Sequence, residues 1–431
     1  MGAGIAGGGG VGEGWGSGMA NHGRKRYGTP LRGSLLTRPV HPFPARMAPG
    51  LALDTLKGLS PQSMVLDPMS GSGTVLRQAA DMGHHALGFD LDPLAVLMAK
   101  VLTTPVLDSA IQVQHERLQI KIAELADENV ALPWIDDDAE TKAFVAYWFG
   151  DKQTKALRKL AFAINALKED DVGQQYLAAT DVLSLNLSRI IVTKEQAASL
   201  ARDTSHSRPH RVSLTSDFDV LEGFGRSLTN VRKRLLEAPP TAGAVISCGD
   251  ARAMNSLEAD SIDAVITSPP YLNAIDYLRG HRMSLIWLGW KLADLRTIRS
   301  ASIGAERAPD PRTGRDGIDA AVAAMVDREA LAPRHRGMID RYAEDLRAMM
   351  SEVSRVLRLG GKATFVVGNS CLKGAFVKNA DGVAYAASQC GLMEISRSER
   401  DLPLKNRYLP VTGEALAKRM RTETVLTFQA A

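Results

Sequence analysis

The chain has 431 residues, of which 45% are hydrophobic and 23% are charged, an ordinary composition for a soluble globular protein. Its length leaves room for about two or three domains, or for one large domain with insertions. The net charge of +4 permits a polyanionic partner without requiring one, and no apolar run of about 18 residues is present to cross a bilayer.

The cysteine pattern and the N-terminus predict a cytoplasmic protein. Cys248, Cys371 and Cys390 lie far apart and form no CxxC pair, which argues against a disulfide framework and against a structural zinc site. Residues 1–18 are rich in glycine and lack the apolar segment of a secretory signal. We therefore expect reduced thiols and no bound metal.

Residues 1–38 are expected to form a disordered N-terminal arm. The first part is glycine-rich and of low complexity, and residues 21–38 contain five arginine and lysine side chains. This basic stretch is either a solvated arm or a segment that contacts a phosphate backbone, and both interpretations stay open.

A strand, a glycine-rich turn, a helix and a second strand then follow one another. The corresponding residues are 64–67, 68–73, 74–82 and 86–90, and a further helix is predicted at 93–101. This alternation is typical of a doubly wound parallel sheet in an α/β protein.

The alternation stops at residue 104, where we expect a large helical insertion that ends at residue 240. Apolar residues recur there at helical spacing, in 116–128, 154–168 and 218–237. The sheet domain, 39–103 and 241–431, resumes with strands at 244–247 and 263–267 and a helix at 274–289. A mobile loop is expected at about 301–337, because its first part is rich in Arg, Asp, Pro and Gly. The remaining elements are a helix at 339–359 and strands at 363–367, 394–398 and 423–428.

The first motif with chemical meaning is the turn DPMSGSGT at residues 67–74. Glycines after a first strand let the backbone approach a ligand, and open α/β sheets bind ligands beyond the carboxyl ends of their strands. Asp90 ends the second strand, 17 residues after Gly73, where a carboxylate can accept hydrogen bonds from ribose hydroxyls. No Gly-Lys-Ser/Thr follows, and Leu76 stands in place of the third glycine of the dinucleotide fingerprint. The turn indicates a nucleoside-bearing cofactor, and the alternative interpretation is an ordinary tight turn.

The second motif is TSPPY at residues 267–271, directly after an apolar strand. Two prolines fix the backbone dihedral angle φ at this point. The Ser268 hydroxyl and the Ser268 and Pro269 carbonyls offer acceptors, and Tyr271 offers a flat ring. This set suits a planar heterocycle with an exocyclic amino group, although alone it is also a plain turn that ends a strand.

The two motifs together resemble those of the amino-group DNA methyltransferases, which use S-adenosylmethionine to modify cytosine N4 or adenine N6. The TSPPY form is most similar to the cytosine-N4 branch. Residues 41–47 resemble the family's segment next to the methionine end of the cofactor. Gly249-Asp250 resembles the family's acidic position near the adenine, and residues 357–362 resemble the turn before its fifth strand. The resemblance covers residues 41–103 and 244–428.

This resemblance implies a doubly wound, Rossmann-like methyltransferase sheet that binds S-adenosylmethionine. It implies cofactor contacts for eleven residues: Pro44, Asp67, Pro68, Ser70, Gly71, Ser72, Gly73, Thr74, Asp90, Asp92 and Asp250. The catalytic residues would be Ser268, Pro269, Pro270 and Tyr271, acting on a base flipped out of DNA. No cysteine follows the strand at 263–267, which disfavours cytosine-C5 methylation because that reaction needs a covalent thiolate.

We therefore expect a site-specific DNA methyltransferase acting on cytosine N4, with a cognate restriction endonuclease as a further partner and no membrane association. The alternatives are a DNA adenine-N6 enzyme, an RNA enzyme acting on guanine N2 or adenine N6, and a regulator that binds nucleic acid without catalysis.

A charged loop at 202–211 inside the insertion is the predicted DNA contact. It contains Arg202, Arg208 and Arg211, and Arg189 lies shortly before it. Phosphate contacts need cations of this kind. The loop is equally a solvated connection that caps two helices, and both interpretations stay open.

Overall fold

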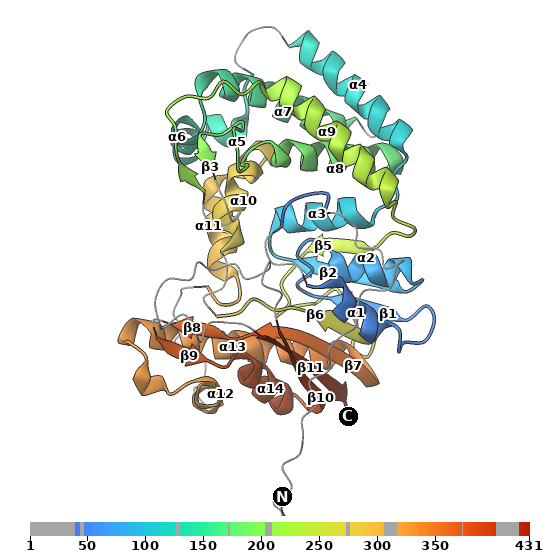
Figure 1. The fold of residues 1–431 in the computed structure, drawn as a ribbon, viewed down its shortest axis with the longest axis vertical. Coiled ribbons are helices and arrows are strands. Elements are labelled where there is room, and N and C mark those ends of the chain that lie inside the picture. The colour runs from blue at the N-terminus through green and yellow to red at the C-terminus, as the bar shows by residue number, and fades with distance from the viewer. Residues whose placement is uncertain are drawn as a thin grey trace, which may run out of the picture. The chain divides into compact units, whose positions relative to one another are not determined.

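The central element of the structure, a computed structural model, is a seven-stranded sheet (Figure 1). The residues described are 39–43, 47–125, 130–170, 173–202, 209–272, 276–305, 317–372, 374–401 and 422–431. The expected N-terminal arm at 1–38 lies outside them. From one edge to the other the strands are β10 (Leu392–Asp401), β11 (Thr422–Ala430), β7 (Leu357–Gly368), β6 (Ile262–Thr267), β1 (Met64–Asp67), β2 (His85–Asp90) and β5 (Val245–Cys248).

The strand order is that of a doubly wound sheet. Starting from β1, the chain adds β2 and β5 on one side and then β6 and β7 on the other, all in parallel. Only β11 runs antiparallel to its neighbours β7 and β10. The direction of growth reverses between β1 and β6, and such a switch point is where open sheets of this kind bind ligands.

The central strands of the sheet are buried on both faces, and their alternate side chains enter different cores. Val65 and Ile266 pack with α1 (Pro49–Leu56), α2 (Thr74–Asp81) and α3 (Pro93–Thr103). Leu66 and Val265 pack with α12 (Ile318–Met325), α13 (Pro333–Val356) and α14 (Asn379–Gln389) on the other face. Burial on both faces explains why these strands are continuous apolar runs.

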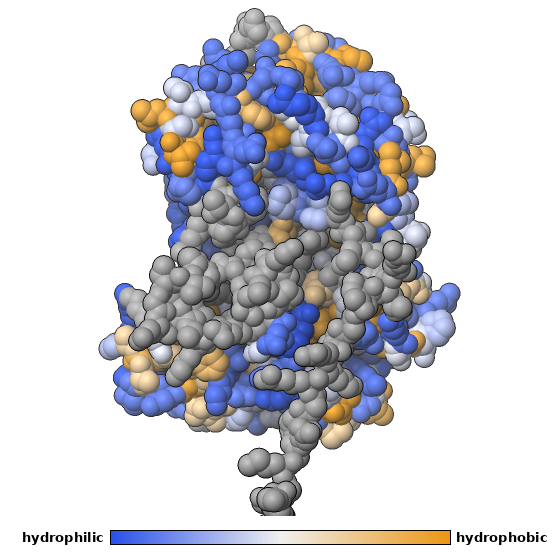
Figure 2. Space-filling view, viewed as in Figure 1, coloured by the Kyte–Doolittle hydropathy of each residue, from blue (hydrophilic) through white to orange (hydrophobic). Residues whose placement is uncertain are grey.

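The expected helical insertion is confirmed, and it has its own core. Its elements are α4 (Asp108–Glu124), α5 (Pro133–Asp136), α6 (Ala139–Trp148), α7 (Asp151–Glu169), α8 (Gln174–Arg189), β3 (Ala201–Arg202), β4 (His210–Arg211) and α9 (Val220–Glu237). The outer surface visible in Figure 2 is mostly hydrophilic over this part, with apolar residues scattered on it. Three elements that follow the TSPPY motif join the same core: α10 (Tyr277–Leu285), the short helix η1 (Ile286–Leu288) and α11 (Leu292–Ala301).

A buried arginine attaches the insertion to the sheet domain. Arg77 of α2 forms an ion pair with Asp81 at 2.7 Å and donates to the Leu102 carbonyl oxygen at the end of α3. It also donates to the Pro239 carbonyl oxygen at 2.8 Å, just after α9. One guanidinium therefore holds both ends of the insertion next to the sheet.

Several expected elements differ from the observed ones. The loop expected at 301–337 is wrong for its second half, where α12, η2 (Arg328–Ala330) and the start of α13 are helical, while residues 306–316 lie outside the described ranges. The helix expected at 339–359 ends at Val356, because residues 357–359 already belong to β7. The helix expected at 274–289 begins at Tyr277 and finishes as η1. The hairpin of β8 (Ser370–Leu372) and β9 (Ala375–Val377) was not anticipated.

Within the described part of the chain, no helix has the length and apolarity needed to cross a membrane.

Candidate active site

The two sequence motifs meet at the carboxyl ends of the neighbouring strands β1 and β6. The Thr267 hydroxyl donates a hydrogen bond of 2.7 Å to Asp67 Oδ1, across 200 residues of sequence. The Met69 backbone N–H donates to the same oxygen at 3.3 Å. Both Asp67 and Thr267 are buried. Burial raises the pKa of Asp67 to about 7, although the two hydrogen bonds act in the opposite direction.

The glycine-rich turn is anchored to the end of the second strand. The Ser70 backbone N–H donates to the Phe89 carbonyl oxygen at 2.8 Å, and the Gly71 N–H donates to Asp90 Oδ2 at 2.8 Å. Pro68 is buried just after β1, and Thr74 is the first residue of α2. Gly71 and Gly73 both have positive φ, +50° and +82°. The turn therefore requires glycine at these two positions for its backbone conformation.

The glycines of the turn are predicted from sequence to let the backbone approach a ligand, and this reason is wrong for Gly73. A Cβ atom at Gly73 would lie 2.9 Å from both Cα and Cβ of Ala99 in α3. The missing side chain at Gly73 thus allows α3 to pack close to the turn, and it does not leave space for a ligand. At Gly71, a Cβ atom would lie 3.2 Å from the ring of Phe43.

Two buried hydroxyl groups in the turn have no hydrogen-bond partner among the described residues. They are Ser70 Oγ and Ser72 Oγ, on residues that are only 6% and 8% exposed. Buried polar atoms are rarely left unpaired in proteins, so such atoms call for a partner other than the described residues. The turn can therefore offer two hydrogen-bonding groups to a polar ligand.

Besides Asp67, three acidic residues expected at the cofactor lie just at or after neighbouring strand ends. Asp90 accepts hydrogen bonds from the Gly71 and Asp92 backbone N–H groups. Desolvation, followed by repulsion from Asp92, raises the pKa of Asp90 to about 6. Asp92 caps α3 by accepting from the Leu94 N–H, and its second oxygen contacts Nδ1 of the buried His281 of α10 at 2.5 Å.

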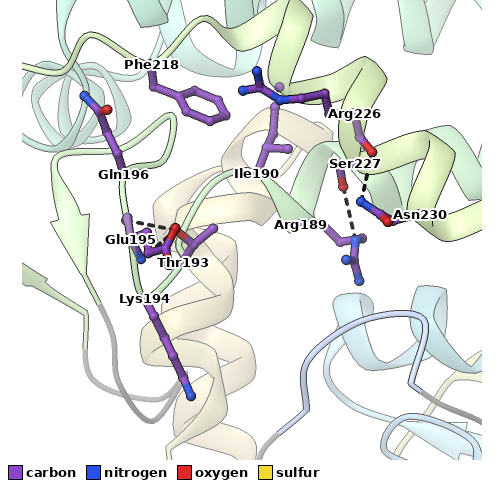
Figure 3. A pocket seen from close by; sticks show the side chains of 11 residues that line it. Arg189, Ile190, Thr193, Lys194, Glu195, Gln196, Phe218, Arg226, Ser227 and Asn230 are labelled. Carbon is purple, nitrogen blue, oxygen red and sulfur yellow. Dashed lines mark hydrogen bonds between the residues drawn. The ribbon is translucent and has the colours of Figure 1, made fainter.

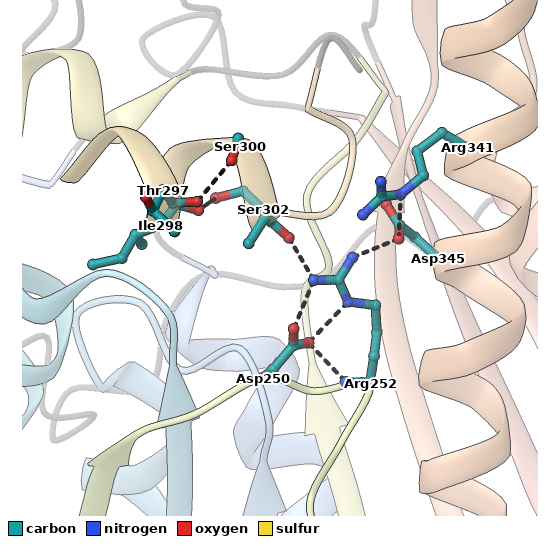
Figure 4. Close-up of polar contacts among 9 residues, drawn as sticks. Asp250, Arg252, Thr297, Ile298, Ser300, Ser302, Arg341 and Asp345 are labelled. Atoms are coloured by element: carbon teal, nitrogen blue, oxygen red, sulfur yellow. Dashed lines mark hydrogen bonds and ion pairs between the residues drawn. The ribbon is translucent and has the colours of Figure 1, made fainter. Parts of the chain in front are cut away.

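Asp250, the third acidic position, is held by an arginine. Both of its carboxylate oxygens accept hydrogen bonds from Arg252, at 2.9 Å and 2.6 Å (Figure 4). Arg252 also pairs with the buried Asp345 of α13 at 2.5 Å and donates to the Ala301 carbonyl oxygen. This network joins the end of β5 to α11 and α13. The expected contact of Asp250 with a cofactor stays a prediction.

The residues of the TSPPY motif are held against β7 and α13. The Ser268 hydroxyl donates to the Val366 carbonyl oxygen at 2.9 Å, and the buried Tyr342 donates to the Pro270 carbonyl oxygen at 3.2 Å. Pro269 is buried. The ring of Tyr271 is half-buried against the α13 core, and desolvation raises the pKa of its hydroxyl group.

An aromatic group covers the turn from the side of α10. The ring of Phe43 stacks on Tyr277 with centroids 4.9 Å apart, and His281 lies 5.9 Å from Phe43. Phe43 belongs to the segment expected beside the cofactor, whereas Pro44 lies outside the described residues. Sequence reasoning missed His281, Tyr342 and Arg252, because a single histidine, tyrosine or arginine on a helix or in a loop carries no motif.

The four arginines expected at DNA occupy different environments. Arg189 donates to the Val40 carbonyl oxygen and to Ser227 Oγ at 3.2 Å, beside a cavity of about 450 Å³ between α8, α9 and residues 193–196 (Figure 3). Burial, with repulsion from Arg234, lowers the pKa of Arg189 to about 10. Arg211 in β4 lies over the ring of Tyr147 at 4.7 Å. Arg202 in β3 donates to the neighbouring Ala201 carbonyl oxygen, and Arg208 lies outside the described ranges. Arg189 thus has internal partners, which offer no support for a DNA contact.

Comparison with known proteins finds similarity to two curated methyltransferases. The chain is 25% identical to the type II methyltransferase M.MvaI of Kocuria varians over 283 residues, which are 60% of this chain and 59% of that protein. It is 25% identical to the type II methyltransferase M.BsoBI of Geobacillus stearothermophilus over 267 residues, 57% of this chain and 51% of that protein. The chain thus spans little more than half the length of these relatives.

No family model matches the chain. Among solved structures, one described as a DNA modification methylase from Thermus thermophilus, complexed with S-adenosyl-L-methionine, matches with a TM-score of 0.23 and 15% identity. That match covers 42% of this chain and 51% of the other.

Proposed function

We propose that this protein is an S-adenosylmethionine-dependent DNA methyltransferase that modifies an exocyclic amino group. The amino group that we propose as its target is cytosine N4. The hydrogen bond between Asp67 and Thr267 is the observation that carries the proposal. It joins the cofactor-type turn and the TSPPY motif at adjacent strand ends, at the switch point of a doubly wound sheet. The similarity to two type II methyltransferases supports the same activity, and it supports a role beside a restriction endonuclease.

The residues at the turn fit the proposed cofactor. S-adenosylmethionine carries a polar amino-acid end and a ribose, which both need hydrogen-bonding partners. The unpartnered hydroxyls of Ser70 and Ser72 can supply two, and the Asp90 carboxylate at the end of β2 can accept from ribose hydroxyls. When bound, the cofactor would provide an activated methyl group. Phe43, packed beside Gly71, would limit the access of water to this end of the site.

The TSPPY residues fit the task of presenting an amino group. Because the Ser268 hydroxyl donates its hydrogen bond to the Val366 carbonyl oxygen, its own oxygen keeps lone pairs that can accept a hydrogen bond from the amino group of a base. The hydrogen bond from Tyr342 to Pro270 holds the backbone of the motif in place. Orientation of the amine for in-line attack is then the main contribution of these residues. The base must first leave the duplex, which costs a few kcal/mol.

The surroundings of the cysteines agree with direct transfer to nitrogen. Cytosine-C5 methylation would need a thiolate beside the base. Cys248, the exposed cysteine at the end of β5, has a pKa raised mainly by partial desolvation, so its thiol stays protonated near neutral pH. The TSPPY segment itself contains no cysteine.

Methyl transfer from tritiated S-adenosylmethionine to unmethylated genomic DNA tests the proposal. We expect label in DNA, none in RNA, and N4-methylcytosine as the nucleoside found by mass spectrometry. N6-methyladenine as the only product would retain DNA methylation and reject cytosine as the target. Label in RNA alone would reject the DNA substrate, and cofactor binding without transfer to either would reject the enzyme.

A further inference from the structure

A group of arginines lies on the helices that follow the catalytic motif. Helix α10 begins shortly after Tyr271 and has two different faces. Tyr277 and His281, four residues apart, point toward Phe43 and Asp92 at the carboxyl edge of the sheet. Arg279 and Arg282, three residues apart, share another face of the helix. The helix therefore presents cations on one side while its other side touches the proposed cofactor region.

The cations in this group exceed the carboxylates that pair with them. Asp276 accepts from Arg299 of α11 at 2.6 Å and lies 3.7 Å from Arg279, so one carboxylate serves two guanidinium groups. Arg296, one turn earlier on α11, is paired with Glu140. For Arg282, no carboxylate of the described residues lies within ion-pairing distance. Within this part of the chain, Arg282 thus has no direct ion pair, and the charges of Asp276 and Glu140 act on it only from further away.

The position of Arg282 is fixed, and one of its nitrogen atoms lacks a partner. Its guanidinium lies over the ring of Phe144 of α6, 5.1 Å from the centroid. Its Nε atom is buried and has no hydrogen-bond partner among the described residues. Desolvation, followed by repulsion from Arg299 and Arg279, lowers the pKa of Arg282. An anion at this place would relieve that repulsion, and the stacked guanidinium is already oriented to bind it.

We propose that Arg279, Arg282 and Arg299 bind phosphates of the DNA strand next to the flipped base. This inference rests on the proposed function. A DNA strand that places a base at residues 268–271 must pass close to the protein segment that follows this motif. Helix α10 is the first helix of that segment. A planar guanidinium can bind a phosphate through two parallel hydrogen bonds, and contacts of this kind set the position of a protein on DNA.

The salt dependence of duplex binding tests this inference in the full-length protein. Fluorescence anisotropy with a labelled duplex of mixed sequence measures the phosphate contacts without knowledge of the recognition site. For Arg282→Gln, the slope of log Kd against log salt should fall by about 0.9, and for the double variant Arg279→Gln/Arg282→Gln by about 1.8. Arg282→Lys should retain most of the slope because it keeps the charge.

The matched control is Arg358→Gln, which removes the same charge. Arg358 pairs with Asp263 at the amino ends of β7 and β6, whereas the TSPPY motif follows the carboxyl end of β6. The slope of Arg358→Gln should equal that of the wild type. Calorimetric affinity for S-adenosylmethionine and the melting temperature should stay unchanged in the Arg282 variants, which shows that they are folded.

An unchanged slope in the folded double variant would overturn the inference, as would duplex binding that does not depend on salt. If DNA is methylated but the slopes are equal, the inference fails and the proposed function stands. If the slopes change but no methyl group is transferred, the proposed function fails and the phosphate site stands. Salt-dependent binding to RNA alone would reject both.

Discussion

The buried carboxyl group of Asp67 should make the protein less stable as the pH rises from about 4 to about 8. The pKa of Asp67 in the folded protein is about 7, whereas an ordinary aspartate has a pKa of about 3.9. A group whose pKa is raised by folding contributes stability below its unfolded pKa, and this contribution is lost as the pH rises through its folded pKa. The difference corresponds to about 4 kcal/mol in the free energy of unfolding.

The variant Asp67→Asn isolates this effect. An amide oxygen can still accept the hydrogen bonds of Thr267 and Met69, but it carries no charge at any pH. Urea denaturation followed by circular dichroism, repeated from about pH 4 to about pH 8, gives the free energy of unfolding of both proteins. We expect the wild type to lose up to about 4 kcal/mol relative to Asp67→Asn over this range. Asp90, whose raised pKa acts in the same direction, is common to both proteins, and its repulsion of Asp67, the smallest of the causes acting on Asp67, is part of the measured difference.

An exposed aspartate provides the control. Asp54 on α1 has a side chain that is 56% exposed, so Asp54→Asn should follow the wild-type profile. If the profiles of wild type and Asp67→Asn were parallel between about pH 4 and about pH 8, the burial of a carboxyl group between the two motifs would be refuted.

Three further outcomes are expected. Gly73→Val should lower the melting temperature measured by calorimetry. The left-handed backbone at this position costs about 1–3 kcal/mol for a residue other than glycine, and the new Cβ would lie 2.9 Å from Ala99. An unchanged melting temperature would contradict this packing. Ser268→Ala should retain cofactor affinity while methyl transfer falls about tenfold or more, the equivalent of one lost hydrogen bond. The exposed control Ser388→Ala should transfer methyl groups at the wild-type rate. Full turnover by Ser268→Ala would remove Ser268 from the acceptor site. Arg211→Ala should reduce the salt slope of duplex binding by about 1, with cofactor affinity intact, and a slope equal to that of the wild type would exclude this loop as a DNA contact.

The strands of the sheet and the turns that end them could be predicted from sequence because they depend on neighbouring residues. The run at 64–67 and the run at 263–267 are mostly apolar; Pro68 follows the first directly, and Pro269 follows the second after one serine. Such signals are local, and the observed bounds of β1 and β6 lie within one residue of those predicted. The second half of the loop at 301–337 was predicted wrongly, because Ile318 and Val322 form a helix only by packing under the sheet.

The sequence by itself determined the fold class and the two motifs, because strand periods and turn residues report on a few neighbouring positions. Only the tertiary structure decided that Asp67 contacts Thr267, that Gly73 faces α3, and that Arg189 donates hydrogen bonds to Val40 and Ser227. It also brought Arg282 beside Arg299, with Phe144 of a distant helix underneath. These contacts join residues far apart in the chain, and their free energy depends on burial and on the charges nearby. A pattern of residue types contains neither quantity until the chain has folded.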